Sequence, residues 1–264
     1  NSKLHAARTK DNRDVVILLL SDGTSGNNAL EALQVVGTGV AASIDRNHVL
    51  PMLQTVHHDN LVFGVFPMVG KSSISPWFGC LADGLEFVSQ IMEGVAFMHE
   101  RRVVHRDLFL TNFLSSRRSG CWDPDKRSDF LCPRYYIIDF EWAIYFPSSD
   151  ATVVGPPTDW SNYNRPSPPE MRSAEPHCPF KADAWQLGRS FRLLLEGIPD
   201  ILDLFESMCS DDPDMRLTAR VALDRFKDLR IGISSTVLRQ AFEEPYWLCM
   251  VEDEFEEDLP PLPQ

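Results

Sequence analysis

The residues best suited to chemistry lie in the segment 105–112, which reads His-Arg-Asp-Leu-Phe-Leu-Thr-Asn. An aspartate and an asparagine five positions apart, here Asp107 and Asn112, can converge on one phosphoryl-transfer centre. The carboxylate would orient an attacking hydroxyl and accept its proton, and the amide oxygen would help to hold a metal ion. The competing interpretation of so short a motif is a chance surface loop.

A second carboxylate stands at the end of a short apolar run, in the sequence Ile-Ile-Asp-Phe-Glu at 137–141. A buried strand that ends at Asp139 can deliver this carboxylate to a metal ion. The alternative is a simple turn at a strand end, where aspartate is common. The segment 105–112 upstream favours the metal-binding interpretation.

The elements that must position these residues change in kind along the chain. Apolar runs at 14–20 and 61–66 predict buried strands, and a helix is predicted from Asn28 to near Gly37. From residue 85 the apolar side chains recur every three or four positions, the spacing of one helical face. Later helices are predicted at 182–195, 201–209 and 217–229. This segregation of strands from helices predicts an α+β fold with a small sheet-rich lobe followed by a helical one.

Three further motifs follow the first two in a fixed order. Pro-Pro-Glu ends at Glu170, Asp-Ala-Trp-Gln-Leu-Gly begins at Asp183, and Asp-Pro-Asp-Met-Arg ends at Arg216. Each motif is weak alone, but the ordered series over residues 85–230 is specific. On this series the chain resembles the protein kinase family, with its H-R-D-x-x-x-x-N catalytic loop, D-F-G, A-P-E, D-x-W-x-L-G and D-P-x-x-R motifs.

The resemblance implies a bilobal protein-kinase-like fold that uses ATP and Mg²⁺. The implied reaction is phosphoryl transfer to a protein hydroxyl, with serine or threonine favoured over tyrosine. Asp107 and Asn112 would be the catalytic residues, and Asn112 and Asp139 the metal ligands. The residues implied as structural support are His105, Arg106, Glu170, Asp183 and Arg216, of which Glu170 and Arg216 would form an ion pair.

The expected nucleotide site departs from the family where the chain should grip ATP. Val-Val-Ile-Leu at 15–18 aligns with V-A-I-K, so Leu18 occupies the place of the ATP-binding lysine. Glu31 is the expected helix glutamate and would lack its lysine partner. Phe66, at the end of the second strand, and Asp139 complete the residues expected around the nucleotide.

Three other departures affect the loops. The stretch 3–10 is interpreted as the second strand of the small lobe, so the glycine-rich phosphate loop is absent from this sequence. The Gly-x-Gly string at 37–42 follows a helix rather than a strand and is interpreted as a helix end. Phe109 stands where serine/threonine kinases keep a substrate-orienting lysine. Glu141 replaces a glycine, which should reduce backbone mobility there.

The expected organisation is a partial N-lobe at 1–68, a C-lobe at 69–250 and an acidic, mobile tail at 251–264. The C-lobe would contain the catalytic loop, the activation segment and a long insert at 115–134. The D-F-E variant, the insert and the segment 180–188 resemble the divergent kinase-like proteins abundant in mushroom-forming fungi.

Composition restricts the partners. The formal net charge of −13 argues against a nucleic-acid surface, which needs basic side chains to replace counterions. The six cysteines form no C-x-x-C pair and fit a reducing compartment. With no apolar leader at the start and no run of eighteen apolar residues, we expect an intracellular, cytoplasmic protein without membrane contact. Its expected partners are a nucleotide and a protein, and its oligomeric state is left open.

Two other functions remain open. Leu18, the missing phosphate loop and Phe109 favour a pseudokinase scaffold with weak or no turnover, whereas Asp107 and Asn112 oppose it. A small-molecule kinase of the aminoglycoside or choline type shares the bilobal fold and a similar Ile-Asp-Phe-Glu strand end. The motifs that end the ordered series favour a protein kinase over that third possibility.

Overall fold

A computed structural model of the protein describes residues 4–70, 78–116, 133–148, 163–172, 176–192, 194–195 and 197–242. Most of the predicted insert and the whole acidic tail lie outside these described residues. Within them, no helix is long and apolar enough to cross a membrane.

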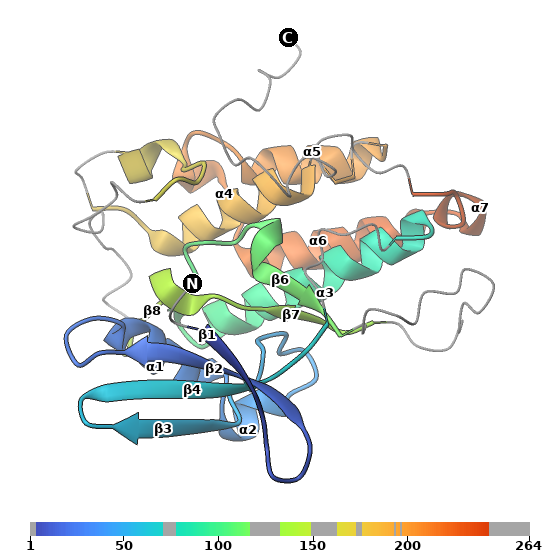
Figure 1. Ribbon diagram of the computed structural model, residues 1–264. Coiled ribbons are helices and arrows are strands. Elements are labelled where there is room, and N and C mark those ends of the chain that lie inside the picture. The colour runs from blue at the N-terminus through green and yellow to red at the C-terminus, as the bar shows by residue number, and fades with distance from the viewer. Residues whose placement is uncertain are drawn as a thin grey trace.

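Four antiparallel strands form the sheet-rich part, at the lower side of Figure 1. They are β1 (Leu4–Arg8), β2 (Asp14–Ser21), β3 (Gln54–His58) and β4 (Leu61–Pro67), in the order β1-β2-β4-β3. The apolar, partly β-branched sequence of β2 suits its place between two neighbours. Its register sets Leu18 opposite Gly64 and Val16 opposite Phe66. The two strands expected from apolar runs are therefore adjacent in the sheet.

Helix α1 (Asn27–Val36) connects this sheet to the rest of the molecule, and the short α2 (Gly39–Ala42) follows it. Its buried residues are Ala29, Ala32, Leu33 and Val36, which share one face because they recur every three or four positions. This face packs against β2, the 3₁₀ turn η3 (Phe140–Trp142) and β8 (Ile144–Tyr145). The helix therefore contacts both the sheet and the segment that follows Asp139.

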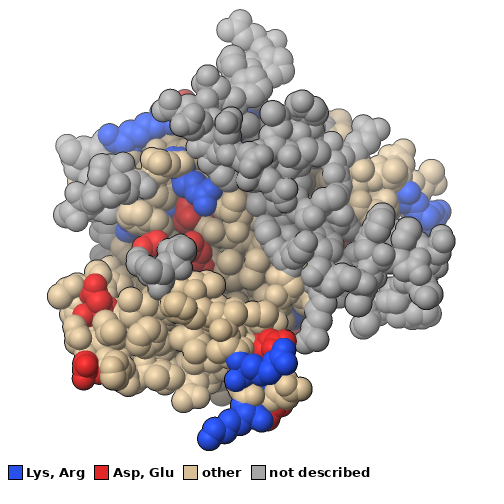
Figure 2. Space-filling view, viewed as in Figure 1, with Lys and Arg blue, Asp and Glu red and all other residues tan. Residues whose placement is uncertain are grey.

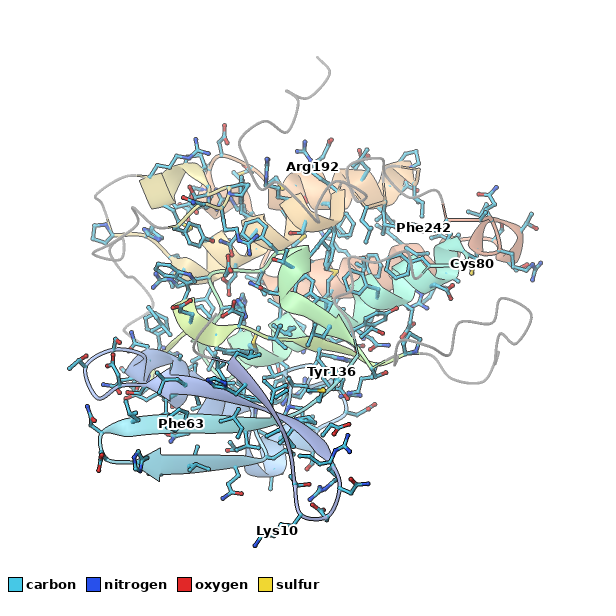
Figure 3. The ribbon with its side chains drawn as sticks, in the orientation of Figure 1. Lys10, Phe63, Cys80, Tyr136, Arg192 and Phe242 are labelled. Atoms are coloured by element: carbon cyan, nitrogen blue, oxygen red, sulfur yellow. The ribbon has the colours of Figure 1, made fainter. Side chains whose placement is uncertain are left out.

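The helical part lies on the opposite side in Figure 1. It contains α3 (Leu81–Glu100), α4 (Pro179–Arg192), α5 (Pro199–Met208), α6 (Ala219–Gly232) and α7 (Ser235–Leu238). Helix α3 begins at a capping box in which Asp83 accepts the backbone N–H of Cys80. Phe242 lies beside this end of α3 (Figure 3), with its ring 4.9 Å from that of Phe78.

Short strands and 3₁₀ turns carry the loops between the two parts. Strand β5 (Val103–Val104) pairs with β8, and β6 (Phe113–Ser115) pairs with β7 (Tyr135–Ile137). The 3₁₀ turns η1 (Leu110–Asn112), η5 (Pro169–Arg172) and η6 (Pro213–Met215) complete the described elements. Because β6 follows Asn112 and β7 precedes Asp139, this pairing brings both candidate residues to one end of the same small ribbon.

An aromatic cluster holds that ribbon against the helices. The ring of Phe87 on α3 contacts Phe113 of β6, Tyr135 of β7 and Phe191 of α4, with centroid distances of 5.9, 4.9 and 5.8 Å. All four side chains are buried. The cluster fixes β6 and β7 relative to α3 and α4, which is the first requirement for a defined site.

The predicted α+β class is confirmed, with a small antiparallel sheet and several helices. The division of the chain at residues 68 and 69 stays a prediction.

The crossing of α4 and α5 supplies a test of this packing. A Cβ on Gly188 would lie 2.7 Å from Met208 Cβ and 2.8 Å from the Phe205 carbonyl oxygen. The substitution Gly188→Ala should therefore lower the free energy of unfolding by about 1–3 kcal/mol, measured by urea denaturation. Gly232→Ala is the matched control, because nothing lies within 4 Å of its added Cβ. Equal destabilisation by both changes would contradict the assigned helix contact.

Candidate active site

The backbone of the loop after β5 is held by one carboxylate on α4. The side chain of Asp183 is fully buried and accepts hydrogen bonds from the backbone N–H groups of His105, at 2.8 Å, and Arg106, at 2.7 Å. The ring Nε2 of His99 lies 2.9 Å from the same carboxylate. A buried charge is tolerated only when it is hydrogen-bonded or paired, and these contacts meet that requirement.

The same face of α4 supports the loop at two more points. The Gln186 side chain accepts the Leu108 N–H at 3.1 Å and donates to the Arg106 carbonyl oxygen at 3.0 Å. Ser190 donates to the Leu108 carbonyl oxygen at 3.0 Å. Asp183, Gln186 and Ser190 are spaced by three and four residues, so one helical face satisfies the loop's polar backbone.

Two non-glycine residues at the site have left-handed backbones, Arg106 with φ of 69° and Asp139 with φ of 65°. Such conformations cost free energy and persist where surrounding contacts enforce them. At Arg106 those contacts are the bonds to Asp183 and Gln186, and Tyr163 donates its hydroxyl to the Arg106 carbonyl oxygen at 2.9 Å. Burial raises the pKa of Tyr163, which keeps this hydroxyl a donor.

Asp107 and Asn112 lie in direct contact. The Asn112 amide nitrogen donates to the Asp107 carbonyl oxygen at 2.9 Å and to its carboxylate Oδ2 at 2.6 Å. Asp107 is buried, and its Oδ1 has no hydrogen-bond partner within the described residues. The Nε of Arg165 lies 3.6 Å from that oxygen, beyond hydrogen-bond reach. One carboxylate oxygen is therefore fixed by Asn112, and the other is buried beside the Arg165 guanidinium without a hydrogen bond within the described residues.

The residues flanking Asp139 are tied to the same loop. The Ile138 N–H donates to the Asn112 carbonyl oxygen at 2.9 Å, and His105 Nε2 donates to the Ile138 carbonyl oxygen at 2.9 Å. The rings of His105 and Phe140 meet edge to face at 4.9 Å. These contacts hold Asp139 beside the loop that carries Asn112.

The carboxyl group of Asp139 has a raised pKa, and burial is the main cause. The nearby charges of Asp107 and Glu141 raise this pKa further, while His105 opposes the shift. The negative charges of Asp107 and Glu141 therefore disfavour ionisation of Asp139.

A cavity of ≈ 700 Å³ opens between the sheet, helix α1 and the segment 137–142, and neither Asp107 nor Asn112 is among its described lining residues. Leu18, Phe66 and Asp139, all expected at the nucleotide site, line it. Its charged lining residues within the described chain are Asp22, Asp139 and Glu141, and no lysine or arginine is among them. Figure 2 shows acidic side chains gathered at the junction of the two parts, with basic side chains close by.

The structure does not place Glu31 at this cavity. Glu31 is exposed, and the cavity is lined instead by Ala29 and Leu33 from the same helix. Glu31 lies two positions from both Ala29 and Leu33. Side chains two positions apart on a helix point to roughly opposite sides, so Glu31 faces solvent when Ala29 and Leu33 are buried. The expectation for Glu31 is thus corrected. Lys10 does not supply a positive charge to the cavity, because it lies at the tip of the β1–β2 hairpin and points away from it (Figure 3).

Glu170 and Arg216 form the expected ion pair. The guanidinium of Arg216, which is 2% exposed, bonds both carboxylate oxygens of Glu170, with Nη2 to Oε2 at 2.9 Å. Its Nε donates to the Ser210 carbonyl oxygen at 2.6 Å. This bidentate contact ties η5 to the segment around η6 and lies apart from the cavity lining.

Comparison with known proteins adds an independent observation. No protein-family model matches the chain. It is 32% identical over 136 residues to the serine/threonine-protein kinase ppk27 of Schizosaccharomyces pombe, covering 49% of this chain and 31% of that protein. It is 27% identical over 149 residues to the mouse tyrosine-protein kinase Srms, covering 49% and 28%. It is 22% identical over 203 residues to the human testis-specific serine/threonine-protein kinase 4, covering 71% and 58%.

The chain is related to the protein kinase superfamily. It spans about a third of the length of the first of these relatives. Because serine/threonine and tyrosine kinases both match this kinase-related chain, the similarity identifies the superfamily but leaves the acceptor residue open.

The residues of this kinase-related chain suit a magnesium ion. Asp139 offers a carboxylate, and Asn112 turns its amide nitrogen toward Asp107, which leaves the amide oxygen on the other side. Such hard oxygen ligands suit Mg²⁺, which is typically bound by one or two carboxylates together with substrate phosphates. Within the described residues, no group of three or more His, Cys, Asp or Glu side chains could hold a metal alone.

Several site residues were not expected from the sequence, among them Gln186, Tyr163 and Arg165. Gln186 lies three positions after Asp183 on the same helix, so helical spacing could have indicated it. Tyr163 and Arg165 come from a stretch without periodicity or a recognised motif, and no local signal pointed to them.

The buried Asp183 network predicts a large effect on stability. Asp183→Ala removes the acceptor for the N–H groups of His105 and Arg106, so the free energy of unfolding should fall by about 2–5 kcal/mol. Chemical denaturation followed by tryptophan fluorescence measures this change. The control is Asp224→Ala on the exposed face of α6, with an expected effect within about 0.5 kcal/mol. Similar values for the two variants would contradict the assigned role.

Proposed function

We propose that this protein transfers the γ-phosphoryl group of ATP, bound with Mg²⁺, to a protein hydroxyl. The observation that carries the proposal is the Asp107 carboxylate, with Oδ2 fixed by Asn112 and a buried Oδ1 that lacks a hydrogen-bond partner in the described chain. An acceptor hydroxyl would supply that missing hydrogen bond. Two of the three relatives described above are serine/threonine kinases, which supports serine or threonine as the acceptor.

The reaction follows from the roles of these side chains. Asp107 Oδ1 accepts the hydrogen bond of the acceptor hydroxyl and takes its proton as the hydroxyl oxygen bonds to the γ-phosphorus. The bond from that phosphorus to the bridging oxygen breaks, and ADP leaves. Asn112 and Asp139 would hold the metal ion, which supplies positive charge to the phosphate oxygens when bound. The protein contributes mainly position and electrostatic stabilisation.

The cavity lining supports an account of how ATP would be held. Val16, Leu18 and Phe66 present an apolar surface suited to an adenine ring. The phosphates of a bound ATP would lie near carboxylates, because the charged residues of the described lining are acidic and include no lysine or arginine. We infer that ATP binding depends on the metal ion more strongly than binding of the uncharged adenosine.

A pseudokinase scaffold is the second candidate, because a specific observation favours it. Leu18 cannot pair with phosphate, and Glu31 points to solvent, so the cavity has no lysine–glutamate pair among its described lining residues. Loss of one preorganised electrostatic contact typically costs a factor of about 10²–10³ in rate. Such a loss weakens catalysis without removing Asp107 or the metal ligands.

The role of Asp107 can be tested directly. Asp107→Asn keeps the size of the side chain but removes the base, so single-turnover transfer from labelled ATP to protein should fall by about 10²–10⁴. Nucleotide affinity should stay unchanged. Asp224→Asn on the exposed face of α6 serves as the control.

The outcomes of that assay distinguish the candidate functions and test the role of Asp107. Transfer at the original rate by the Asp107→Asn variant would exclude this carboxylate as the base. Absence of transfer by the folded wild-type protein would favour the scaffold. Phosphorylation of choline or an aminoglycoside without protein phosphorylation would identify a small-molecule kinase.

The missing lysine yields a second prediction. In calorimetric titrations of the wild-type protein, removal of Mg²⁺ should weaken ATP binding and leave adenosine binding unchanged. Leu18→Lys introduces a charge-assisted hydrogen bond to phosphate, so ATP affinity without metal should rise by about 10–100-fold. Leu18→Met is the control for side-chain size. Metal-independent ATP binding by the wild type would contradict this account of the cavity.

A further inference from the structure

A cation reaches the catalytic loop from a distant segment. The guanidinium carbon of Arg165 lies 5.6 Å from the centroid of the Phe109 ring. Its Nη2 donates to Thr111 Oγ1 at 2.9 Å, and its Nε lies 3.6 Å from Asp107 Oδ1. Arg165 therefore contacts three alternate residues of the loop from outside it.

The loop backbone explains this spacing. Phe109 has an extended conformation, with φ of −116° and ψ of 160°. In extended chain, side chains two positions apart lie on the same side, which fits the approach of one guanidinium to positions 107 and 109, and Thr111 follows in the 3₁₀ turn η1. The aromatic ring is a suitable platform, because the planar guanidinium stacks well on aromatic faces. Phe109 thus helps to hold the guanidinium of Arg165 beside the loop, although its own side chain is uncharged.

We propose that Arg165 supplies the positive charge for the transferred phosphoryl group, in place of the lysine expected at position 109. This inference rests on the proposed function. The acceptor hydroxyl and the γ-phosphate must both meet beside Asp107 Oδ1, and the Arg165 guanidinium lies beside that oxygen. A planar fork of N–H donors matches phosphate oxygens. It also offsets part of the negative charge of Asp107, Asp139 and Glu141.

The competing role is purely structural, with Arg165 anchoring its own segment to the catalytic loop. The two roles differ in whether Arg165 contacts the γ-phosphate, which ATP has and ADP lacks. An anchor affects ATP and ADP binding alike, whereas a phosphoryl ligand favours ATP over ADP. The ratio of the two affinities therefore separates the roles, and it is measurable even without turnover.

The experiment uses the full chain with saturating Mg²⁺ and measures the Kd of ATP and of ADP by calorimetry. Arg165→Met should reduce the ATP-over-ADP preference by about 10-fold, and Arg165→Lys should reduce it less. The double variant Phe109→Lys/Arg165→Met returns a cation to the loop and should restore the preference. Arg172→Met, an exposed arginine of η5 that bonds the Ser167 carbonyl oxygen, is the control.

The possible outcomes are distinct. Equal weakening of ATP and ADP by Arg165→Met, with no rescue by the double variant, would overturn the inference. If Arg165→Met fails to fold, Arg165→Lys decides the question through the same ratio. A wild-type protein that prefers ATP through Arg165 but transfers no phosphate would refute the proposed function and support the inference. Undiminished transfer and preference in Arg165→Met would refute the inference alone.

Discussion

The Asp183 carboxylate accepts three hydrogen bonds in a fully buried position, two of them from the backbone of the catalytic loop. Without those donors, the buried charge would carry a large desolvation cost. Without that acceptor, the N–H groups of His105 and Arg106 would be unsatisfied. Helix α4 and the loop therefore fix each other, and Arg106 is held in its left-handed conformation. The chain then turns so that Asp107 meets Asn112.

The second consequence is electrostatic. Once the loop and β7 are joined through Ile138, the carboxylates of Asp107 and Asp139 lie close enough for the charge of Asp107 to raise the pKa of Asp139. Burial and neighbouring charge raise the pKa of Asp139, so the surroundings oppose ionisation of this carboxyl group. A nearby positive charge would offset this repulsion between carboxylates. The described cavity lining offers no cation from the sheet, because Leu18 is apolar, and the nearest described arginine contact in this region is that of Arg165 with Asp107.

The sequence predicted those parts of the site that depend on local pattern. The α+β class and the kinase relationship are confirmed, and the ordered motifs correctly identified segments that the structure places in contact, including Asp183 with the catalytic loop. The position of Glu31 was wrong because the phase of α1 is set by packing of its apolar face against β2 and η3, which the helix pattern alone does not specify. Arg165 could not be foreseen, since its contacts join residues 54 or more positions apart.

The relation between Asp107 and Leu18 bears on whether such a site serves catalysis or only binding. A buried acceptor without a hydrogen bond typically costs about 1–3 kcal/mol of stability. A scaffold gains nothing from that cost at Asp107 Oδ1, whereas a base that must receive a substrate hydroxyl requires it. The leucine at position 18 weakens phosphate binding but leaves this geometry intact. In the proposed reaction, the Arg165 guanidinium held against Phe109 would act at the transferred group, where charge develops, rather than at the phosphates that remain on the nucleotide. Under this proposal the site would bind ATP less tightly in the ground state and would keep the interaction that accelerates transfer.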